Sequence, residues 1–364
     1  MAFTAKDVAD LRAKTGAGMM DCKNALKETD GDVEKAIDVL REKGLAKATK
    51  KAGRIAAEGV VLAYSDDNGA TVLVEVNSET DFVAKNEKFQ DLVRGVAKTI
   101  AANDPATVEE LQEMTMVGKD ETVAAAFQEA VLSIGENMKI RRFARVTDPA
   151  VTYIHGGGSV GVIVTFDAPA EIVGTDAFVT MGKDVAMQVA AMSPEYLRQS
   201  DIPAEELEKL RNITVESALN TPDTLPKPIL NKVIAKAIAD GMLSDADLAA
   251  YEAEKNNKFL FNFLSKEAVA AFAQVAVACK DEFVADPIFG KAIEGRIAKQ
   301  LKEICLEAQT FVKNDKINVK GYVDSVAKEL GVSISIKSFI RYAKGEGIEK
   351  RNDDFAAEIA SMVK

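Results

Sequence analysis

The fold is decided by residues 70–89, which read A-T-V-L-V-E-V-N-S-E-T-D-F-V-A-K-N-E-K-F. The first half is rich in β-branched residues and follows the turn Asp66–Gly69, so it predicts a strand. The second half predicts the start of a helix, because apolar residues recur at helical spacing: Phe89, Leu92, Val93, Val96 and Ile100. Together with a preceding strand at Val60–Tyr64, the stretch predicts a hairpin that leads into a long helix, and hence an α+β fold.

Between the predicted strand and helix lies a polar turn, Thr80–Asn86, in which Asp81 precedes Phe82. Exposing a phenylalanine forgoes about 1.5–3 kcal/mol of burial, so an aromatic side chain in a turn needs a physical reason. In one interpretation Asp81 caps a helical turn and Phe82 folds back into the core. In the other, Phe82 is an apolar probe aimed at a partner, with a carboxylate beside it. The spacing by itself leaves both interpretations open.

The run T-D-F-V-A-K-N resembles the signature of the bacterial elongation factor Ts family, the nucleotide-exchange factors of elongation factor Tu. A GTPase holds GDP through a phosphate cradle and Mg²⁺, so weakening the metal contact weakens the nucleotide. The resemblance implies that Phe82 wedges between helices beside that site, while Asp81 accepts the N–H groups of a displaced helix end. Thr80 and Val83 complete the segment expected to dislocate the partner's Mg²⁺. The implied partner is Tu, both GDP-bound and nucleotide-free, and no covalent chemistry is expected.

Length and composition limit the other classes of function. The chain has 364 residues, enough for two or three domains at about 150 residues each. A net charge of −11 argues against a nucleic-acid-binding surface spread over the chain. Cys22, Cys279 and Cys305 lie far apart, which indicates reduced thiols rather than disulfides or a zinc site. No apolar leader is present and the most apolar window, Ala268–Cys279, is too short to span a membrane, so we expect a cytoplasmic protein.

Residues 1–54 predict a small module of three helices and a linker. Thr4 and Asp7 have the spacing of a capping box at the start of the first helix. Asp30 is expected to cap the third helix, and Gly44 to end it. The composition shifts near residue 55, where we expect a domain boundary.

The second predicted helix carries two adjacent methionines, Met19 and Met20. Adjacent helical residues point about 100° apart, so we expect one of them in the core and the other free for a partner. The run T-G-A-G-M-M-D-C-K-N-A-L again resembles the family, whose N-terminal module has the ubiquitin-associated fold and docks on the nucleotide-binding domain of Tu. The resemblance therefore implies Leu11, Met19 and Met20 as docking residues. The basic run Leu45–Arg54 predicts a solvated linker helix, with RNA contact as its alternative.

Repeated patterns divide the remaining chain. We expect core subdomains at 55–146 and at 147–204 with 309–345, which resemble one another as a degenerate duplication. A coiled-coil-like helical arm is expected at 205–308, and a C-terminal helical module at 346–364. One leg of the arm has the stripe Leu207, Leu210 and Ile213, and the other has Ile293, Ile297, Leu301 and Cys305.

The middle of the arm, about 220–286, does not match the family pattern and is interpreted as a helical insert. Its Ala-rich segment Lys266–Cys279 must bury its apolar face on other helices or on another chain. We therefore expect the insert to enlarge the arm and to offer a self-association or accessory surface.

Three further segments resemble the family and add expected contacts with Tu. The run S-I-G-E-N implies Ile134 and Gly135. The run H-G-G-G-x-x-G-V implies His155, for which a hydrogen-bonded surface histidine is the alternative. The closing stretch matches the C-terminus of the family, and its last helix adds Phe355.

Gly157–Gly161 fits the G-x-S-x-G nucleophile elbow, but its context excludes a serine hydrolase. An elbow needs a helix after the serine, whereas Gly161–Phe166 continues as a strand, and His155 is in the wrong order to serve Ser159 as its base. The chain has no P-loop sequence and a single histidine, so we expect neither bound GTP nor a transition-metal cluster, and no cofactor. The remaining alternative is a ubiquitin-associated-type adaptor that binds a partner without acting on its nucleotide.

Overall fold

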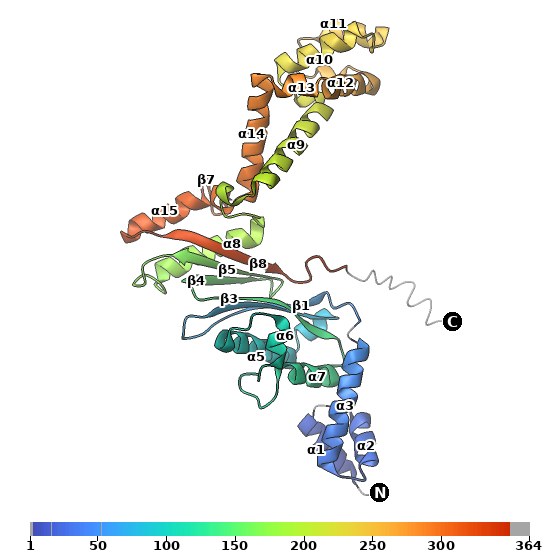
Figure 1. Cartoon of the computed structure of the whole chain (residues 1–364), viewed down its shortest axis with the longest axis vertical. Coiled ribbons are helices and arrows are strands. Elements are labelled where there is room, and N and C mark those ends of the chain that lie inside the picture. Colours follow the sequence, from blue (N-terminus) through green and yellow to red (C-terminus); the bar gives the residue numbers. More distant parts are fainter. Residues whose placement is uncertain (1–2, 16, 52, 350–364) are drawn as a thin grey trace, which may run out of the picture. The chain divides into compact units, whose positions relative to one another are not determined.

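The structure is a computed structural model that describes residues 3–15, 17–51 and 53–349 (Figure 1). It divides into two compact units. One contains Met1–Ser193 together with the segment from Gly321 onward, and the other is Pro194–Lys320. Both helices and antiparallel sheets are present, so the predicted mixture of α and β structure is confirmed.

The N-terminal residues form three helices: α1 (Ala5–Thr15), α2 (Met19–Glu28) and α3 (Val33–Lys51). The predicted capping box is present. The Asp7 carboxylate accepts hydrogen bonds from the N–H and hydroxyl of Thr4 at 2.6 and 2.7 Å, and Thr4 Oγ1 accepts from the Asp7 N–H at 3.3 Å. The helices bury a small common core: Val8, Leu11, Ala17, Cys22, Ala25, Leu26, Ala36 and Leu40.

Two details of this module differ from the prediction. Asp32 rather than Asp30 caps α3, since its carboxylate accepts from the Lys35 N–H at 3.1 Å, while Asp30 adopts a left-handed turn conformation with φ 51°. Helix α3 also continues past Gly44 to Lys51. One glycine costs about 1 kcal/mol in a helix, and the Ala- and Lys-rich residues that follow are good helix formers. The third helix and the linker helix are therefore one element.

The first sheet has the order β1-β2-β3 and is antiparallel throughout. Its strands are β1 (Glu58–Ser65), β2 (Thr71–Ser78) and β3 (Met138–Val146). The predicted hairpin is confirmed, and its turn is closed by Asp66 Oδ1, which accepts from the N–H groups of Asn68 and Ala70 at 3.0 and 2.8 Å. Strand β2 is buried along its whole length because it is the central strand.

Four helices follow β2 in the chain: α4 (Asp81–Ala84), α5 (Glu87–Asn103), α6 (Val108–Glu113) and α7 (Val123–Ile134). Helix α5 contacts β1 and β2 and buries the predicted apolar stripe, including Phe89, Val93 and Ile100. Helix α6 starts at the predicted cap, where Thr107 Oγ1 accepts from the Glu110 N–H at 3.1 Å. Helix α7 ends at Gly135, whose φ of 91° only glycine adopts readily.

The second sheet has the order β4-β5-β8 and is also antiparallel. Its strands are β4 (Ala150–His155), β5 (Val160–Asp167) and β8 (Ser335–Ala343). Helix α8 (Asp176–Met192) packs on β4 and β5. Helix α15 (Val319–Leu330) precedes β8, and the Tyr322 hydroxyl donates to Asp184 of α8 at 2.9 Å.

The two sheets pack face to face, with α5 and α7 on one outer side and α8 on the other (Figure 1). Val61, Leu73 and Ile163 are fully buried between them. At Gly161 a Cβ atom would lie only 2.5 Å from Val61 Cγ1 and 2.7 Å from Leu73 Cδ1. The last glycine of the elbow-like pattern is thus required by close packing of two sheets, and the predicted hairpin turn at this point is confirmed.

The unit Pro194–Lys320 is built on two paired helices, α9 (Ala204–Asn220) and α14 (Pro287–Ile304). Four further helices lie between them in the chain: α10 (Lys227–Ala239), α11 (Asp245–Glu254), α12 (Lys266–Ala278) and α13 (Lys280–Val284). Short 3₁₀ turns lie at Gln199–Asp201, Pro222–Thr224, Leu260–Asn262 and Leu306–Ala308. The strands β6 (Thr310–Phe311) and β7 (Asn314–Asn318) form a small ladder.

Two expectations about this unit change. Ile213 does not continue the half-buried stripe of Leu207 and Leu210: it is 54% exposed, because α12 also packs on α9 and the buried side of α9 includes Thr214 and Val215 instead. The Ala-rich helix α12 buries its apolar face on α9 and α10, within the unit. Neighbouring helices rather than another chain therefore cover that face.

Candidate partner-binding site

Residues Thr80–Lys85, here named the α4 turn, form one turn of helix between β2 and α5. Phe82 is 80% exposed, whereas Val83 is 6% exposed and packs in the core of the first sheet. Of the two interpretations of this turn, the one that folds Phe82 into the core is therefore wrong. Thr80 rather than Asp81 is the N-cap: its hydroxyl lies 3.5 Å from the Val83 N–H. Val83 anchors the turn, and its burial makes Phe82 and Asp81 the side chains that a partner can reach.

Asp81 is exposed and pairs with Lys85 one helical turn later, at 2.8 Å. The hydrogen bond from Lys85 is the main reason why the pKa of Asp81 lies below its usual value, and the charge of Lys344 adds to the effect. The carboxylate is therefore ionised at neutral pH and can accept hydrogen bonds from a partner that displaces Lys85.

The segment after α7 holds the α4 turn in place. Glu136 accepts from the Thr80 N–H at 2.9 Å and from the Thr80 hydroxyl at 2.7 Å. In return, Glu79 accepts from the Asn137 N–H at 2.6 Å. Ile134 is half-buried and Gly135 is exposed, so the predicted contacts of this segment lie directly beside the α4 turn.

The β4–β5 turn lies near the same place. Gly158 bonds Val61 of β1 through its carbonyl at 2.8 Å, and the Ser159 carbonyl accepts from the Lys344 N–H at 2.8 Å. Lys344 is the residue whose charge reaches Asp81. The structure thus gathers the turns that carry Phe82, Gly135 and His155 around β1, although they come from distant parts of the sequence.

His155 itself is exposed, and its Nδ1 lies 2.9 Å from the Tyr153 hydroxyl. The alternative of a hydrogen-bonded surface histidine is therefore confirmed, and a role in partner contact stays a prediction. The Ser159 hydroxyl donates to the Gly156 carbonyl at 2.9 Å. Since each side chain uses a different partner, the structure gives no support to a serine nucleophile activated by His155.

The expected docking residues of the N-terminal module have different exposures. Leu11 is fully buried in the module core, so its side chain is not presented to a partner. Met19 is 46% exposed and Met20 is 62% exposed. The expectation that one methionine lies in the core is wrong, because Cys22, Ala25 and Leu26 form the buried side of α2 instead. Phe355 lies outside the described residues.

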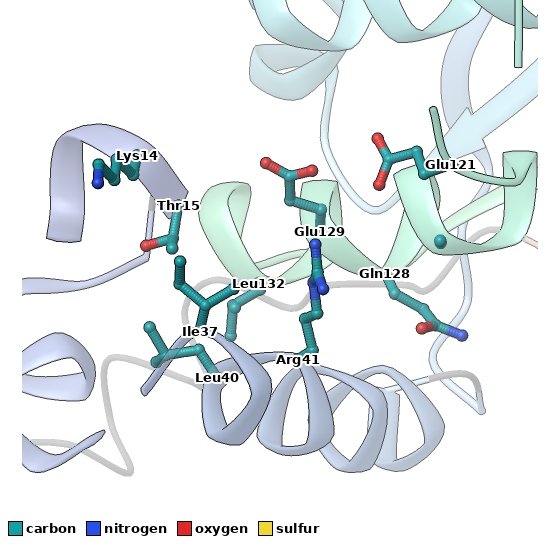
Figure 2. A pocket seen from close by; sticks show the side chains of 10 residues that line it. Lys14, Thr15, Ile37, Leu40, Arg41, Glu121, Gln128, Glu129 and Leu132 are labelled. Carbon is teal, nitrogen blue, oxygen red and sulfur yellow. The ribbon is translucent and has the colours of Figure 1, made fainter. Parts of the chain in front are cut away.

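A hollow of about 270 Å³ lies between the N-terminal module and α7 (Figure 2). Figure 2 shows the Arg41 side chain extending from α3 toward α7. Of the predicted contact residues that the structure describes, none lines this hollow. Its lining residues are Lys14, Thr15, Ile37, Leu40, Arg41, Glu121, Ala125, Gln128, Glu129 and Leu132. The candidate site is a set of projecting turns, which suits a protein partner better than a small molecule.

Comparison with known proteins agrees with the resemblance of these segments. The family model described as elongation factor TS matches residues 79–246 and 242–346. The chain belongs to the elongation factor Ts family. An elongation factor Ts from Trichlorobacter lovleyi is 41% identical, over 99% of this chain and 98% of its own. Those from Clostridium novyi and Syntrophotalea carbinolica are 39% and 38% identical, over 98% and 100% of this chain and 97% and 100% of their own.

The family model matches in two segments that meet within residues 220–286, and the relatives match over nearly the whole chain. The interpretation of this stretch as a helical insert stays a prediction. Among the described residues, no helix is long and apolar enough to cross a membrane.

Sequence reasoning missed the residues that hold the site together. Glu136 could have been suspected, because it is a carboxylate directly after Gly135, the left-handed residue that ends α7. Glu79 and Lys344 gave no local signal, because their roles depend on contacts with segments far away in the chain.

Proposed function

We propose that this chain is a guanine-nucleotide exchange factor of translation elongation that binds elongation factor Tu and promotes release of its GDP. Membership of the elongation factor Ts family supports elongation factor Tu as the partner. The single observation that carries it further is the α4 turn, where Phe82 is 80% exposed beside an anchored Val83. Leaving a phenylalanine in water costs about 1.5–3 kcal/mol, which a partner that buries it would return.

In the proposed mechanism, Phe82 inserts between helices of Tu beside its Mg²⁺ site. Asp81 then exchanges its bond with Lys85 for the free N–H groups at the end of a displaced partner helix, where a negative charge is favoured. Groups that support the Mg²⁺ shift, and GDP loses part of its binding energy because the metal bridges protein and phosphates. Thr80 and Val83 take part by fixing the turn, not by direct contact through Val83, which is buried.

Such a factor and GDP bind Tu with negative coupling, and the coupling is reciprocal: the factor weakens GDP as much as GDP weakens the factor. A coupling of about 4 kcal/mol corresponds to roughly a thousandfold change in affinity. The factor therefore binds nucleotide-free Tu most tightly and leaves when GTP enters.

We further propose that residues 1–54 form a separate docking module, with Met19 and Met20 as its contacts. Both are exposed on the outer side of α2, and methionine adapts to uneven surfaces. Ile134, Gly135, His155 and Phe355 are the further proposed contacts. The division into core subdomains 55–146 and 147–204 with 309–345, an arm 205–308 and a C-terminal module is part of the same proposal, as is a cytoplasmic location.

The function is tested by mixing Tu loaded with fluorescent GDP with an excess of unlabelled GDP, with and without catalytic amounts of this chain. An increase of at least tenfold in the release rate at a tenth of the Tu concentration would support the proposal. An adaptor would bind Tu, as measured by co-sedimentation, and leave the release rate unchanged.

Self-association through the arm is a separate part of the proposal. The face of α12 that suggested it is covered within the unit, but Phe259 and Phe263 are 60% and 49% exposed between α11 and α12. We propose that these two side chains offer an accessory or self-association surface.

A further inference from the structure

We propose that Glu136 is a positioning residue for nucleotide exchange: its carboxylate fixes the α4 turn so that Phe82 is presented in one orientation. This inference rests on the proposed function and concerns a residue outside the expected contacts with Tu. Glu136 is not expected to touch the partner's nucleotide site itself; it acts through Thr80.

The α4 turn needs outside support because it is too short to hold itself. Helix α4 has four residues, and a single helical turn has an unfavourable nucleation free energy in water. Its buried anchor is Val83, while Asp81 and Phe82 are exposed. The Gln90 amide also holds the end of the turn, by donating to the Ala84 carbonyl at 2.6 Å. The start of the turn, which determines the direction of Phe82, still has freedom that neither of these contacts removes.

Glu136 removes that freedom at the first residue of the turn. Its two carboxylate oxygens accept from the N–H and from the hydroxyl of Thr80, at 2.9 and 2.7 Å. With its proton committed to Glu136, the Thr80 hydroxyl presents a lone pair to the Val83 N–H, which lies 3.5 Å away. Glu136 therefore orients the N-cap as well as the backbone.

A second carboxylate makes the arrangement reciprocal. Glu79 accepts from the Asn137 N–H at 2.6 Å, so each segment gives a carboxylate to a backbone N–H of the other. The Ser78 hydroxyl donates to the Thr80 carbonyl at 2.9 Å. Hydrogen bonds to an ionised acceptor are roughly twice as strong as neutral ones. Such bonds suit a contact that must keep its geometry while Phe82 binds the partner.

The chemistry requires a carboxylate at position 136. A glutamine of the same shape has one acceptor oxygen and one amide nitrogen that only donates. It would place donor against donor at either the Thr80 N–H or the Thr80 hydroxyl. Glu136→Gln is therefore a nearly isosteric test of the orientation, and Thr80→Val removes the hydroxyl half from the other side.

The first measurement needs no partner. In the whole chain, hydrogen exchange of the Lys85 and Asn86 amides reports the α4 turn, because they bond the Phe82 and Val83 carbonyls at 3.2 and 2.9 Å. Glu136→Gln should speed their exchange about tenfold, as expected for loss of a charged hydrogen bond. The matched control is Glu121→Gln, which removes a carboxylate that pairs with Lys119 at 2.8 Å, away from the turn. Unchanged protection in Glu136→Gln would overturn the proposal.

The second measurement follows GDP release from Tu. Glu136→Gln should lower the release rate at saturating factor about tenfold, with a smaller change in the affinity for nucleotide-free Tu. In the Phe82→Ala background the same substitution should have little further effect, because there is no side chain left to orient. Equal effects in both backgrounds would refute the positioning role and leave a merely structural one. Recovery of part of the activity by Glu136→Asp would support it.

The two measurements separate the two proposals. If the unaltered chain does not accelerate GDP release, the proposed function fails, and the hydrogen-exchange result still decides whether Glu136 orders the turn. If release is accelerated but Glu136→Gln behaves as the unaltered chain does in both measurements, only the role of Glu136 fails.

Discussion

In the first sheet the chain runs from β2 through residues 79–86 into α5, and in the second it runs from β5 through a connection of the same length, residues 168–175, into α8. Both helices begin with a side-chain cap and end at a left-handed residue, Asp104 with φ 51° and Ser193 with φ 48°. Their buried residues also correspond in order: Phe89, Leu92, Val96, Ala97 and Ile100 in α5, and Phe178, Met181, Val185, Ala186 and Val189 in α8.

The two connections share an anchor but differ beside it. Val83 in the first and Ile172 in the second are buried to a similar degree, 6% and 8% exposed. Next to the anchor, Phe82 in the first connection corresponds to the exposed Glu171 in the second. The two connections thus place different side chains beside a similar anchor, a protruding aromatic in the first and an ordinary charged surface residue in the second. The buried anchor therefore fixes the place of the turn, and the residue next to the anchor determines whether an aromatic side chain is presented.

A second difference lies inside the sheets. Glu75 of β2 is fully buried and is bonded by Arg141, Arg142 and the Gly345 N–H, whereas the corresponding Val164 of β5 is an ordinary core residue. The Glu75 carboxylate joins the first sheet to the segment that follows β8, so only one of the two sheets carries this ionic joint.

The largest effect on stability is expected when Glu75 of the first sheet is replaced by valine, the residue at the corresponding position 164 of the second sheet. Glu75→Val should lower the free energy of unfolding by about 3–5 kcal/mol, because two half-buried arginines lose their buried counter-charge. Thermal and urea unfolding would measure it, with Glu171→Val as an exposed control. A loss below about 1 kcal/mol would mean that the joint is not structural.

The same residue predicts a dependence on pH. Burial would raise the pKa of Glu75, but the hydrogen bonds from Gly345, Arg142, Asn77 and Arg141 outweigh it and hold the pKa below its usual value of 4.5. A lowered folded-state pKa stabilises the fold fully above the unfolded value, and this stabilisation is lost as pH falls through the folded one. The stability difference between Glu75→Val and the unaltered chain should therefore shrink below about pH 4.5.

The next largest effect is expected on the rate of nucleotide exchange, from the residue that differs between the two connections. Phe82→Glu, which copies Glu171, should slow GDP release from Tu about 30-fold or more, as expected for loss of a hot-spot side chain worth about 2 kcal/mol. The reverse change, Glu171→Phe, should leave release unchanged. A melting temperature within about 2 °C of the unaltered chain is expected for Phe82→Glu, since the side chain is exposed. A large loss of folding would instead indicate that Phe82 supports the core.

A smaller effect is expected outside the two sheets. Met20→Ala should weaken the complex with Tu about fivefold, or about 1 kcal/mol, with the release rate at saturation unchanged. Titration calorimetry with nucleotide-free Tu would measure this change in affinity, with Lys27→Ala, at an exposed position of α2, as the control.

Leu11→Ala should act on stability instead, because removing a buried leucine should destabilise the module by about 2–5 kcal/mol. Equal behaviour of the two variants would remove the distinction between surface and core in this module.

The smallest effect on exchange is expected in the second unit. Phe259→Ser combined with Phe263→Ser should change GDP release by less than twofold, while lowering any tendency to self-associate in sedimentation velocity. A marked loss of exchange in the folded double variant would place a functional surface in the arm and weaken the emphasis on the two sheets.

Features that depend on near neighbours in the chain could be predicted from the sequence. A β-branched run behind the turn Asp66–Gly69 predicted the hairpin of β1 and β2. Helical spacing predicted the buried face of α5, and Thr4 with Asp7 predicted the first cap, because these patterns act over a few residues. The short run around Phe82 also pointed to the family. Where the local pattern was ambiguous, as with Met19 and Met20, the expectation failed because burial depends on what packs against the helix.

The contacts that hold the site together form only when distant segments meet in the folded chain. Thr80 and Glu136 are 56 positions apart in the chain, and Gly345 and Glu75 are 270 apart. No local pattern links such pairs, since each meets its partner only after the sheets have paired and packed. The exposure of Phe82 has the same cause. Val83 faces the core formed by β1, β2 and α5, and the neighbouring Phe82 therefore points to the surface.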